Sequence, residues 1–155
     1  MQDLFSIKGK TALVTGGSRG IGEMIAGGFL ASGAKVYISS RKVEACDAAA
    51  ERLMKRFGGE CSAVPGNAAE LDGISTSVET LSEREDNLDI LVNNAGVGWG
   101  APLEEFPEIG WDKVMDTNVK GVFFLIQQLL PLLKASGTPE DPARVINIGS
   151  IDGIV

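Results

Sequence analysis

A glycine-rich turn between a strand-like and a helix-like segment limits the possible folds of this chain more than anything else in its sequence. Thr11–Thr15 is a short apolar run with β-branched residues, and the turn at residues 16–22 (GGSRGIG) follows it directly. Apolar residues then recur at helical spacing, so the pattern predicts a strand, a tight turn and a helix. Backbone N–H groups in such a turn can approach a pyrophosphate because glycine has no Cβ. The turn therefore predicts a dinucleotide site; tight packing of the helix is the structural alternative.

The alternation of strands and helices continues along the whole chain. Further strands are predicted at residues 34–39, 61–64, 88–92 and 144–148, and further helices at residues 43–57, 70–84 and 111–134. Several of these strands are continuous apolar runs, which is typical of parallel strands covered on both faces. We therefore expect residues 1–155 to form a single α/β domain with a doubly wound parallel sheet.

Composition excludes several classes of function. The chain has no histidine, so it cannot form a Ser-His-Asp or Cys-His catalytic group or a His-ligated metal site, and we expect no metal. Its 14 basic and 21 acidic residues give a net charge of −7 without a basic cluster, which argues against nucleic acid or an anionic membrane as partner. The longest apolar stretch, residues 121–133, is interrupted by polar residues and proline and is too short to span a bilayer.

The cysteines and the first residues bear on the cellular compartment. Cys46 and Cys61 form no CxxC pair, and the first residues lack the pattern of a signal peptide. A cytoplasmic protein with reduced thiols is the simplest interpretation.

The end of the second predicted strand indicates which dinucleotide is bound. An Asp or Glu at this place selects NAD by bonding the ribose 2′-hydroxyl. Here Ser40 and Arg41 follow the strand, and Arg19 in the glycine turn supplies a second cation. Hydroxyl donors and guanidinium groups suit a 2′-phosphate, so the sequence favours NADP(H). The alternative is that Arg41 is an ordinary solvated residue at the start of the next helix.

Four motifs, in order and at strand ends or on the long helix, resemble those of the short-chain dehydrogenases/reductases, which have a Rossmann fold. The motifs are Thr15-Gly16-x-x-x-Gly20-Ile21-Gly22, Asn93-Asn94-Ala95-Gly96, Asn118 within residues 116–119 (DTNV), and Asn147-Ile148-Gly149-Ser150. The resemblance covers essentially the whole chain. The sequence is most similar to the 3-oxoacyl (β-ketoacyl) reductases, and in residues 126–133 and 142–150 to those associated with rhamnolipids.

The resemblance implies roles for individual residues. Ser150 would hydrogen-bond the carbonyl of the substrate, or else only cap its turn, and Asn118 would hold a water in a proton relay, or else bond its own helix. Asn93 is either structural or in contact with the ligand. Asn67 departs from the family pattern, which has an Asp that accepts from the adenine amino group, although an amide oxygen can still accept one bond. The cofactor residues so implied are Thr15, Gly16, Ser18, Arg19, Gly20, Ile21, Gly22, Ser40, Arg41, Asn67, Asn93, Ala95 and Gly96.

The family's chemistry also needs a Tyr-x-x-x-Lys pair shortly after the serine, and residues 151–155 do not contain it. We therefore expect an N-terminal fragment of a longer reductase of carbonyl or acyl substrates, with a sheet incomplete at the C-terminus and residues 144–148 as a bare edge. The resemblance also implies a homo-oligomer paired through the long helix. One alternative is a truncated protein that binds NADP without catalysis. A second, a methyltransferase using S-adenosylmethionine, would carry an acidic residue where Ser40 stands.

Overall fold

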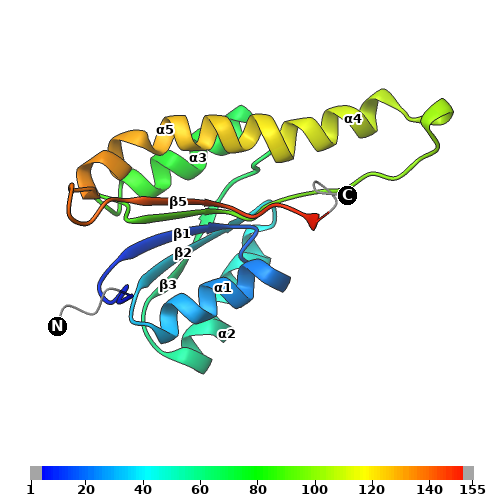
Figure 1. Ribbon diagram of the computed structural model, residues 1–155. Helices are drawn as coiled ribbons and strands as arrows, with labels where there is room; N and C mark the ends of the chain where they lie inside the picture. Colours follow the sequence, from blue (N-terminus) through cyan, green and yellow to red (C-terminus); the bar gives the residue numbers. More distant parts are fainter. Residues whose placement is uncertain (1–4, 152–155) are drawn as a thin grey trace.

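Five parallel strands form one sheet in the computed structural model, which describes residues 5–151. Figure 1 shows the sheet between two layers of helices, and the spatial order of its strands is β3-β2-β1-β4-β5, so the chain winds outward from β1 first in one direction and then in the other. This is the doubly wound Rossmann arrangement, and it confirms the predicted fold class. The strands are β1 (Thr11–Thr15), β2 (Lys35–Ser40), β3 (Cys61–Pro65), β4 (Ile90–Asn93) and β5 (Arg144–Asn147).

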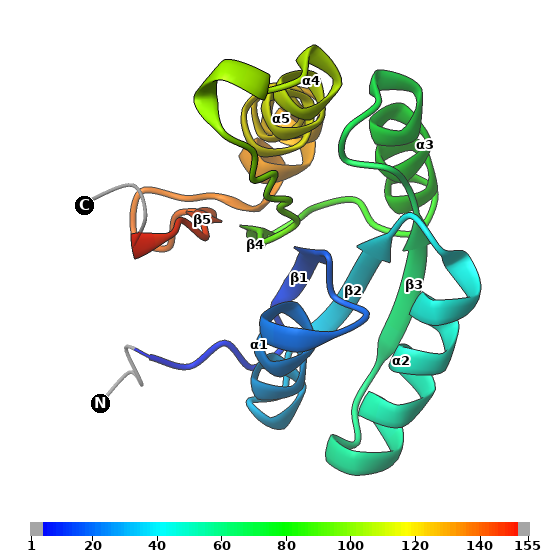
Figure 2. The same cartoon turned by 90° about the vertical axis from the view of Figure 1, so that its right-hand side faces the viewer.

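Helices cover both faces of the sheet (Figure 2). Helices α1 (Gly20–Ala31) and α2 (Val43–Phe57) lie on one face, and α3 (Leu71–Ser82) lies on the other beside α4 (Glu108–Met115) and α5 (Gly121–Ser136). Side chains alternate between the faces along each strand: Val14 packs in the core under α1 and α2, whereas Leu13 packs in the core under α3 and α5. Two buried layers therefore hold the sheet, as continuous apolar strands require.

The long helix differs from its prediction. It begins at Glu108 rather than at residue 111 and ends at Ser136 rather than at residue 134, and η2 (Asp116–Lys120), a π-helical segment, joins α4 to α5. Pro131 lies within α5 without ending it. The whole segment of 29 residues is long and apolar enough to cross a membrane by length and composition, so our argument from length was wrong. Only 22% of the apolar window is buried, and Leu125, Leu129 and Leu133 are the residues of α5 that pack in the core beneath it.

The other differences are small and lie at element ends. The strand predicted at residues 88–92 begins later, at Ile90, and the backbone N–H of Leu88 donates to the carbonyl oxygen of Leu132 in α5. A short 3₁₀ helix, η1 (Leu103–Glu105), was not predicted. At the edge of the sheet, β5 is exposed along its length, as the sequence predicted for this strand.

Candidate nucleotide-binding site

A cavity of about 690 Å³ opens where the carboxyl ends of β1, β2, β3 and β4 meet. This volume is typical of small-molecule and cofactor sites, which usually measure between about 300 and 1,000 Å³. Of the residues that we expected to bind a cofactor, nine line it: Gly16, Ser18, Arg19, Gly20, Ser40, Arg41, Asn67, Ala95 and Gly96. The structure therefore brings together residues from four separate loops.

The glycine turn forms one wall of the cavity, and Gly16 and Gly22 show why several of its positions need glycine. Gly16 has φ of 65°, in the left-handed region that favours glycine. At Gly22, a Cβ would lie 2.4 Å from the carbonyl oxygen of Gly16 and 2.5 Å from Nδ2 of Asn94. The first turn of α1 thus packs directly on the backbone of the turn. Arg19, the residue before α1, makes no side-chain capping bond, so the end of the helix remains available to an anion.

A buried hydroxyl and an amide fix the loop after β4 against the glycine turn. Thr15 Oγ1 accepts hydrogen bonds from the backbone N–H groups of Asn94 (3.0 Å) and Ala95 (2.9 Å), and it donates to the carbonyl oxygen of Val92. Asn94 Nδ2 in turn donates to the carbonyl oxygen of Thr15 at 2.9 Å. Thr15 is 4% exposed, so it lies behind the cavity wall and acts by holding the wall in place.

Asn67 contributes to the wall beyond β3 with both ends of its amide engaged. Its Oδ1 accepts from the backbone N–H of Ala69 at 3.2 Å, and its Nδ2 donates to Glu70 at 2.7 Å. The carbonyl oxygen of an amide has a second lone pair, so it can still accept one bond from an adenine amino group. Contact with adenine stays a prediction.

The charges around the cavity are mostly positive. Arg19 and Arg41 lie on its wall as predicted, and the structure adds Lys42 and Lys113. Glu70 is the one carboxylate among the lining residues that the structure describes. Four cations and one anion leave a local excess of three positive charges in a chain whose net charge is −7. The cavity therefore suits a ligand with several negative charges.

Sequence reasoning missed several residues of the wall. Asn94 was quoted in a motif but not assigned to the site, and Lys42 directly follows Arg41, so both carried a local signal. Lys113 and Thr117 carried none, since they reach the cavity only through the folding of the long helix back over the sheet. The lining residues outside our predicted set are Ser39, Lys42, Ala45, Gly66, Ala68, Ala69, Glu70, Asn94, Val97, Lys113 and Thr117.

Asn118 and Asn93 serve as tethers in the structure. Asn118, within the π-helical segment η2, accepts from the N–H of Val97 at 3.0 Å and donates to the carbonyl oxygen of Val97 at 2.9 Å. It thus bonds the loop after β4 and not its own helix, which was our structural alternative. Asn93 is 4% exposed and donates to Asn147 at 2.8 Å, joining β4 to β5. A water held by Asn118 and a ligand contact of Asn93 stay predictions.

Ser150 lies beyond the carboxyl end of β5, at the same edge of the sheet as the cavity but not on its wall. Ile21 and Gly22, which we also assigned to the cofactor, lie in α1 outside the lining set. Tyr37, the only tyrosine of the chain, is buried in β2 and donates its hydroxyl to Glu85. Burial raises the pKa of Tyr37 and Glu85 reinforces the rise, so this tyrosine is no candidate for a proton donor to a substrate.

The described residues offer little support for a metal site or a reactive thiol. No group of three or more Cys, Asp or Glu side chains suited to a metal occurs within residues 5–151. Both cysteines are free and buried, and burial raises the pKa of the Cys61 thiol to about 11. A glycine turn opening onto a cationic cavity at the carboxyl edge of a doubly wound sheet instead defines a nucleotide-binding domain of the Rossmann type.

Comparison with known proteins narrows this class to one family. A family model described as short chain dehydrogenase matches residues 10–155, and the chain belongs to that family. It is 54% identical over 154 residues to a rhamnolipids biosynthesis 3-oxoacyl-[acyl-carrier-protein] reductase of Pseudomonas aeruginosa, a match that covers 99% of this chain and 59% of the relative. It is 37% identical over 151 residues to the 5-keto-D-gluconate 5-reductase of Escherichia coli, covering 97% of this chain and 58% of that protein.

Solved structures agree with this assignment. The active-site complex of Pseudomonas aeruginosa RhlG with NADP matches with a TM-score of 0.94 and 54% identity, over 100% of this chain and 60% of the other. The L-sorbose reductase of Gluconobacter frateurii in complex with NADPH and L-sorbose matches with a TM-score of 0.87 and 33% identity, over 94% of this chain and 54% of the other. The chain thus spans somewhat more than half the length of these relatives.

Proposed function

We propose that the protein is an NADP(H)-dependent oxidoreductase that reduces a ketone to an alcohol by hydride transfer, and that its substrate carries a 3-oxoacyl group. The main support is the cavity at the carboxyl edge, where four cations face one carboxylate among the lining residues within 5–151, in a chain with a net charge of −7. NADP(H) carries a pyrophosphate and a 2′-phosphate, and the glycine turn and the end of β2 are suited to these two groups. The 54% identity to a 3-oxoacyl-[acyl-carrier-protein] reductase supports the choice of substrate.

In this proposal, different residues of the cavity bind different parts of the cofactor. The turn at residues 16–22 approaches the pyrophosphate with backbone N–H groups, because Gly16 and Gly22 keep Cβ atoms out of the way. Arg41 and Arg19 neutralise the 2′-phosphate. Ser40 lines the cavity and donates its hydroxyl proton to the carbonyl oxygen of Lys42, which shapes the turn; its contact with the 2′-phosphate stays a prediction. Asn67 lies where adenine would bind.

The reaction needs a hydride, a group that polarises the carbonyl and a proton. The nicotinamide supplies the hydride. We assign the polarising hydrogen bond to Ser150, which lies at the same edge of the sheet, and a water of the proton relay to Asn118, which also holds the loop after β4. The proton must reach the developing alkoxide from an acid, and Tyr37 is excluded because it is buried against Glu85.

Cofactor preference tests the proposal directly. Calorimetric titration of the wild type with NADP⁺ and NAD⁺ should show NADP⁺ bound roughly 10- to 100-fold more tightly, the scale of one or two charge-assisted hydrogen bonds. Ser40→Asp combined with Arg41→Ala should shift the preference toward NAD⁺, because the new carboxylate accepts from the free 2′-hydroxyl and repels the phosphate. Arg56→Ala, which removes an arginine outside the cavity, controls for net charge. Equal binding of both cofactors by the wild type would refute the assignment.

The second candidate is a protein that binds NADP(H) without catalysis. Residues 1–155 themselves contain no Tyr-x-x-x-Lys pair, and a missing general acid costs about 10²- to 10⁴-fold in rate. We expect residues 1–155 on their own to leave a 3-oxoacyl substrate unreduced, as followed by NADPH absorbance. Turnover by these residues alone would show that another group supplies the proton.

Two further proposals concern the protein in the cell. The exposed apolar residues of the long helix favour a homo-oligomer, and the two free, buried thiols favour the reducing cytoplasm.

A further inference from the structure

The turn between β2 and α2 places Arg41 and Lys42 on the cavity wall without a conventional helix cap. Lys42 is the residue before α2, and its side chain makes no capping bond. A lysine ammonium cannot cap the N–H groups of a helix, since it has no acceptor. Another interaction must therefore define the path of this turn.

Three hydrogen bonds among Ser40, Lys42 and Cys46 define the path of the turn in the absence of a cap. The carbonyl oxygen of Lys42 accepts from the backbone N–H of Cys46 at 3.2 Å and from Ser40 Oγ at 3.1 Å. Cys46 Sγ then donates to Ser40 Oγ at 3.1 Å. The three bonds form a closed ring, and Arg41 lies between two of its members in sequence.

The direction of the thiol bond follows from the other two. Because the single proton of Ser40 is given to Lys42, Ser40 Oγ can only accept from Cys46. The Cys46 residue is 1% exposed, and its burial raises the pKa of the thiol, so the donor proton is retained at neutral pH. Ser40 and Lys42 line the cavity, whereas Cys46 lies behind them and outside the lining set.

We propose that Cys46 is a positioning residue for recognition of the 2′-phosphate, holding Ser40 and the backbone of residues 41 and 42 so that both cations face the ligand. The inference rests on the proposed binding of NADP(H). It differs from a role in packing alone, because the thiol acts on the part of the cavity that distinguishes NADP(H) from NAD(H). Loss of the donor should therefore weaken NADP⁺ binding and leave NAD⁺ binding unchanged.

The test compares Cys46→Ala with Cys46→Ser in the otherwise unchanged protein. Alanine suits a helix but removes the donor, whereas serine keeps an O–H that can donate to Ser40. By calorimetric titration, Cys46→Ala should weaken NADP⁺ binding about three- to tenfold, the effect of one neutral hydrogen bond, with the Kd for NAD⁺ unchanged. Cys46→Ser should retain the wild-type ratio of the two Kd values. Cys61→Ala is the matched control, since Cys61 is buried and free but outside the cavity.

The outcomes separate this inference from the proposed function. If the wild type does not prefer NADP⁺, the proposed function fails first. If the wild type prefers NADP⁺ but Cys46→Ala has the same ratio of Kd values as the wild type, the positioning role is refuted. An equal weakening of NADP⁺ and NAD⁺ binding leaves that ratio unchanged and indicates a packing effect, which Cys61→Ala would also show. A thermal unfolding curve shows whether each variant is folded. If Cys46→Ala is not folded, Cys46→Ser tests the role: a ratio of its two Kd values that differs from the wild-type ratio refutes it.

Discussion

Individual residues of the site act mostly through backbone geometry. The turn at residues 16–22 needs glycine at positions 16 and 22, because the carbonyl oxygen of Gly16 and the loop residues Asn94 and Ala95 occupy the space that Cβ atoms would fill. Thr15 and Asn94 then join this turn to the loop after β4 through bonds between residues about 80 positions apart. Their contribution is to hold N–H groups and cations at fixed places, which is what binding of a multiply charged ligand requires.

Gly22→Ala tests this geometry. Its Cβ would lie 2.4 Å from a backbone oxygen, so α1 must shift away from the turn. We expect a loss of about 1–3 kcal/mol in the free energy of unfolding, typical of overpacking, and much weaker binding of NADP⁺. Gly28→Ala is the matched control in the same helix: it is exposed, a Cβ there meets nothing within 4 Å, and it should stabilise the protein by about 0.5–1 kcal/mol. Wild-type binding by Gly22→Ala, measured calorimetrically, would contradict the close approach of turn and helix.

Ser150→Ala tests the catalytic assignment. In the active enzyme, loss of a hydrogen-bond donor to the reacting carbonyl should lower kcat roughly 100-fold or more, with little change in the affinity for NADPH. Steady-state kinetics on a 3-oxoacyl substrate provides the measurement, and Ser82→Ala, at the exposed end of α3, serves as control. Near-normal turnover by Ser150→Ala would leave Ser150 as a turn residue only.

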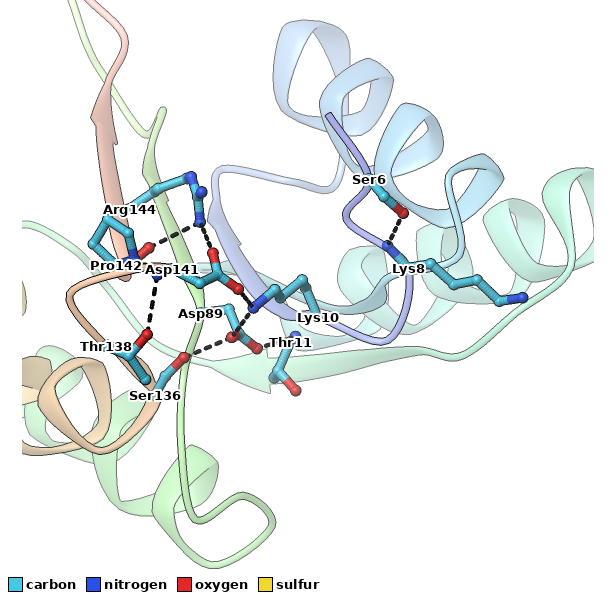
Figure 3. Close-up of polar contacts among 10 residues, drawn as sticks. All are labelled: Ser6, Lys8, Lys10, Thr11, Asp89, Ser136, Thr138, Asp141, Pro142 and Arg144. Carbon is cyan, nitrogen blue, oxygen red and sulfur yellow. Dashed lines mark hydrogen bonds and ion pairs between the residues drawn. The ribbon is translucent and has the colours of Figure 1, made fainter. Parts of the chain in front are cut away.

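At the scale of elements, the amino ends of the strands are joined by a cluster of charged side chains on the edge opposite the cavity (Figure 3). Asp89, just before β4, accepts from the backbone N–H of Thr11 at 2.8 Å, from Ser136 Oγ at 2.6 Å and from Lys10 Nζ at 3.1 Å. Lys10 also pairs with Asp141, which precedes β5. The cluster therefore connects β1, β4, β5 and the end of α5.

The titration of Asp89 determines how this cluster responds to acid. Burial by itself would raise the pKa of Asp89, but the bonds from Ser136, Thr11 and Lys10 outweigh burial and hold the pKa below its usual value of 3.8. A carboxyl group with a lowered pKa in the folded state stabilises the fold above its unfolded pKa. That contribution disappears as the pH falls through the lowered value. The hydrogen bond from Lys10 likewise lowers the pKa of Asp141.

Asp89→Asn should therefore destabilise the protein by about 2–3 kcal/mol at neutral pH, the scale of hydrogen bonds to a charged acceptor. The difference from the wild type should stay constant above about pH 5 and shrink below about pH 4, as the wild-type carboxylate becomes protonated. Urea unfolding at a series of pH values measures both. Asp141→Asn, at a half-exposed side chain, should have a smaller effect. A pH-independent difference between Asp89→Asn and the wild type would contradict the role of the charge.

At the scale of the whole molecule, the long helix and β5 leave apolar surface uncovered. Trp111, Met115, Val119 and Phe123 recur at intervals of four on the helix, and Trp111 and Phe123 are 60% and 61% exposed. Val145 and Ile146 are about 40% exposed at the edge of the sheet. Surfaces of this kind associate with other chains.

We expect the protein to be an oligomer in solution, held by the exposed face of the long helix. Phe123→Arg should shift it toward a smaller species in size-exclusion chromatography with light scattering, because an arginine in an apolar interface loses its hydration. Lys134→Glu, which changes an exposed charge near the end of α5, serves as control. A monomeric wild type would contradict the prediction. For residues 1–155 alone we expect aggregation through β5 as well.

Local patterns along the chain were enough to predict the fold class, the order of the elements and much of the cavity. The bounds of β1 and α2 match the predicted ranges, because strong apolar patterns and glycines at element ends are local signals. The glycine turn and Arg41 were likewise found from their neighbours in sequence.

Which of these residues face the cavity and which support its wall became clear only in the folded protein. Thr15 and Asn93 turned inward, Asn118 bonded Val97, and Lys113 reached the cavity from a helix nearly 100 residues away from the glycine turn. The π-helical segment that carries Asn118 also has no signature in the residue pattern. These features depend on hydrogen bonds and packing between segments that are distant along the chain, and such contacts are set only when the sheet and the helices come together.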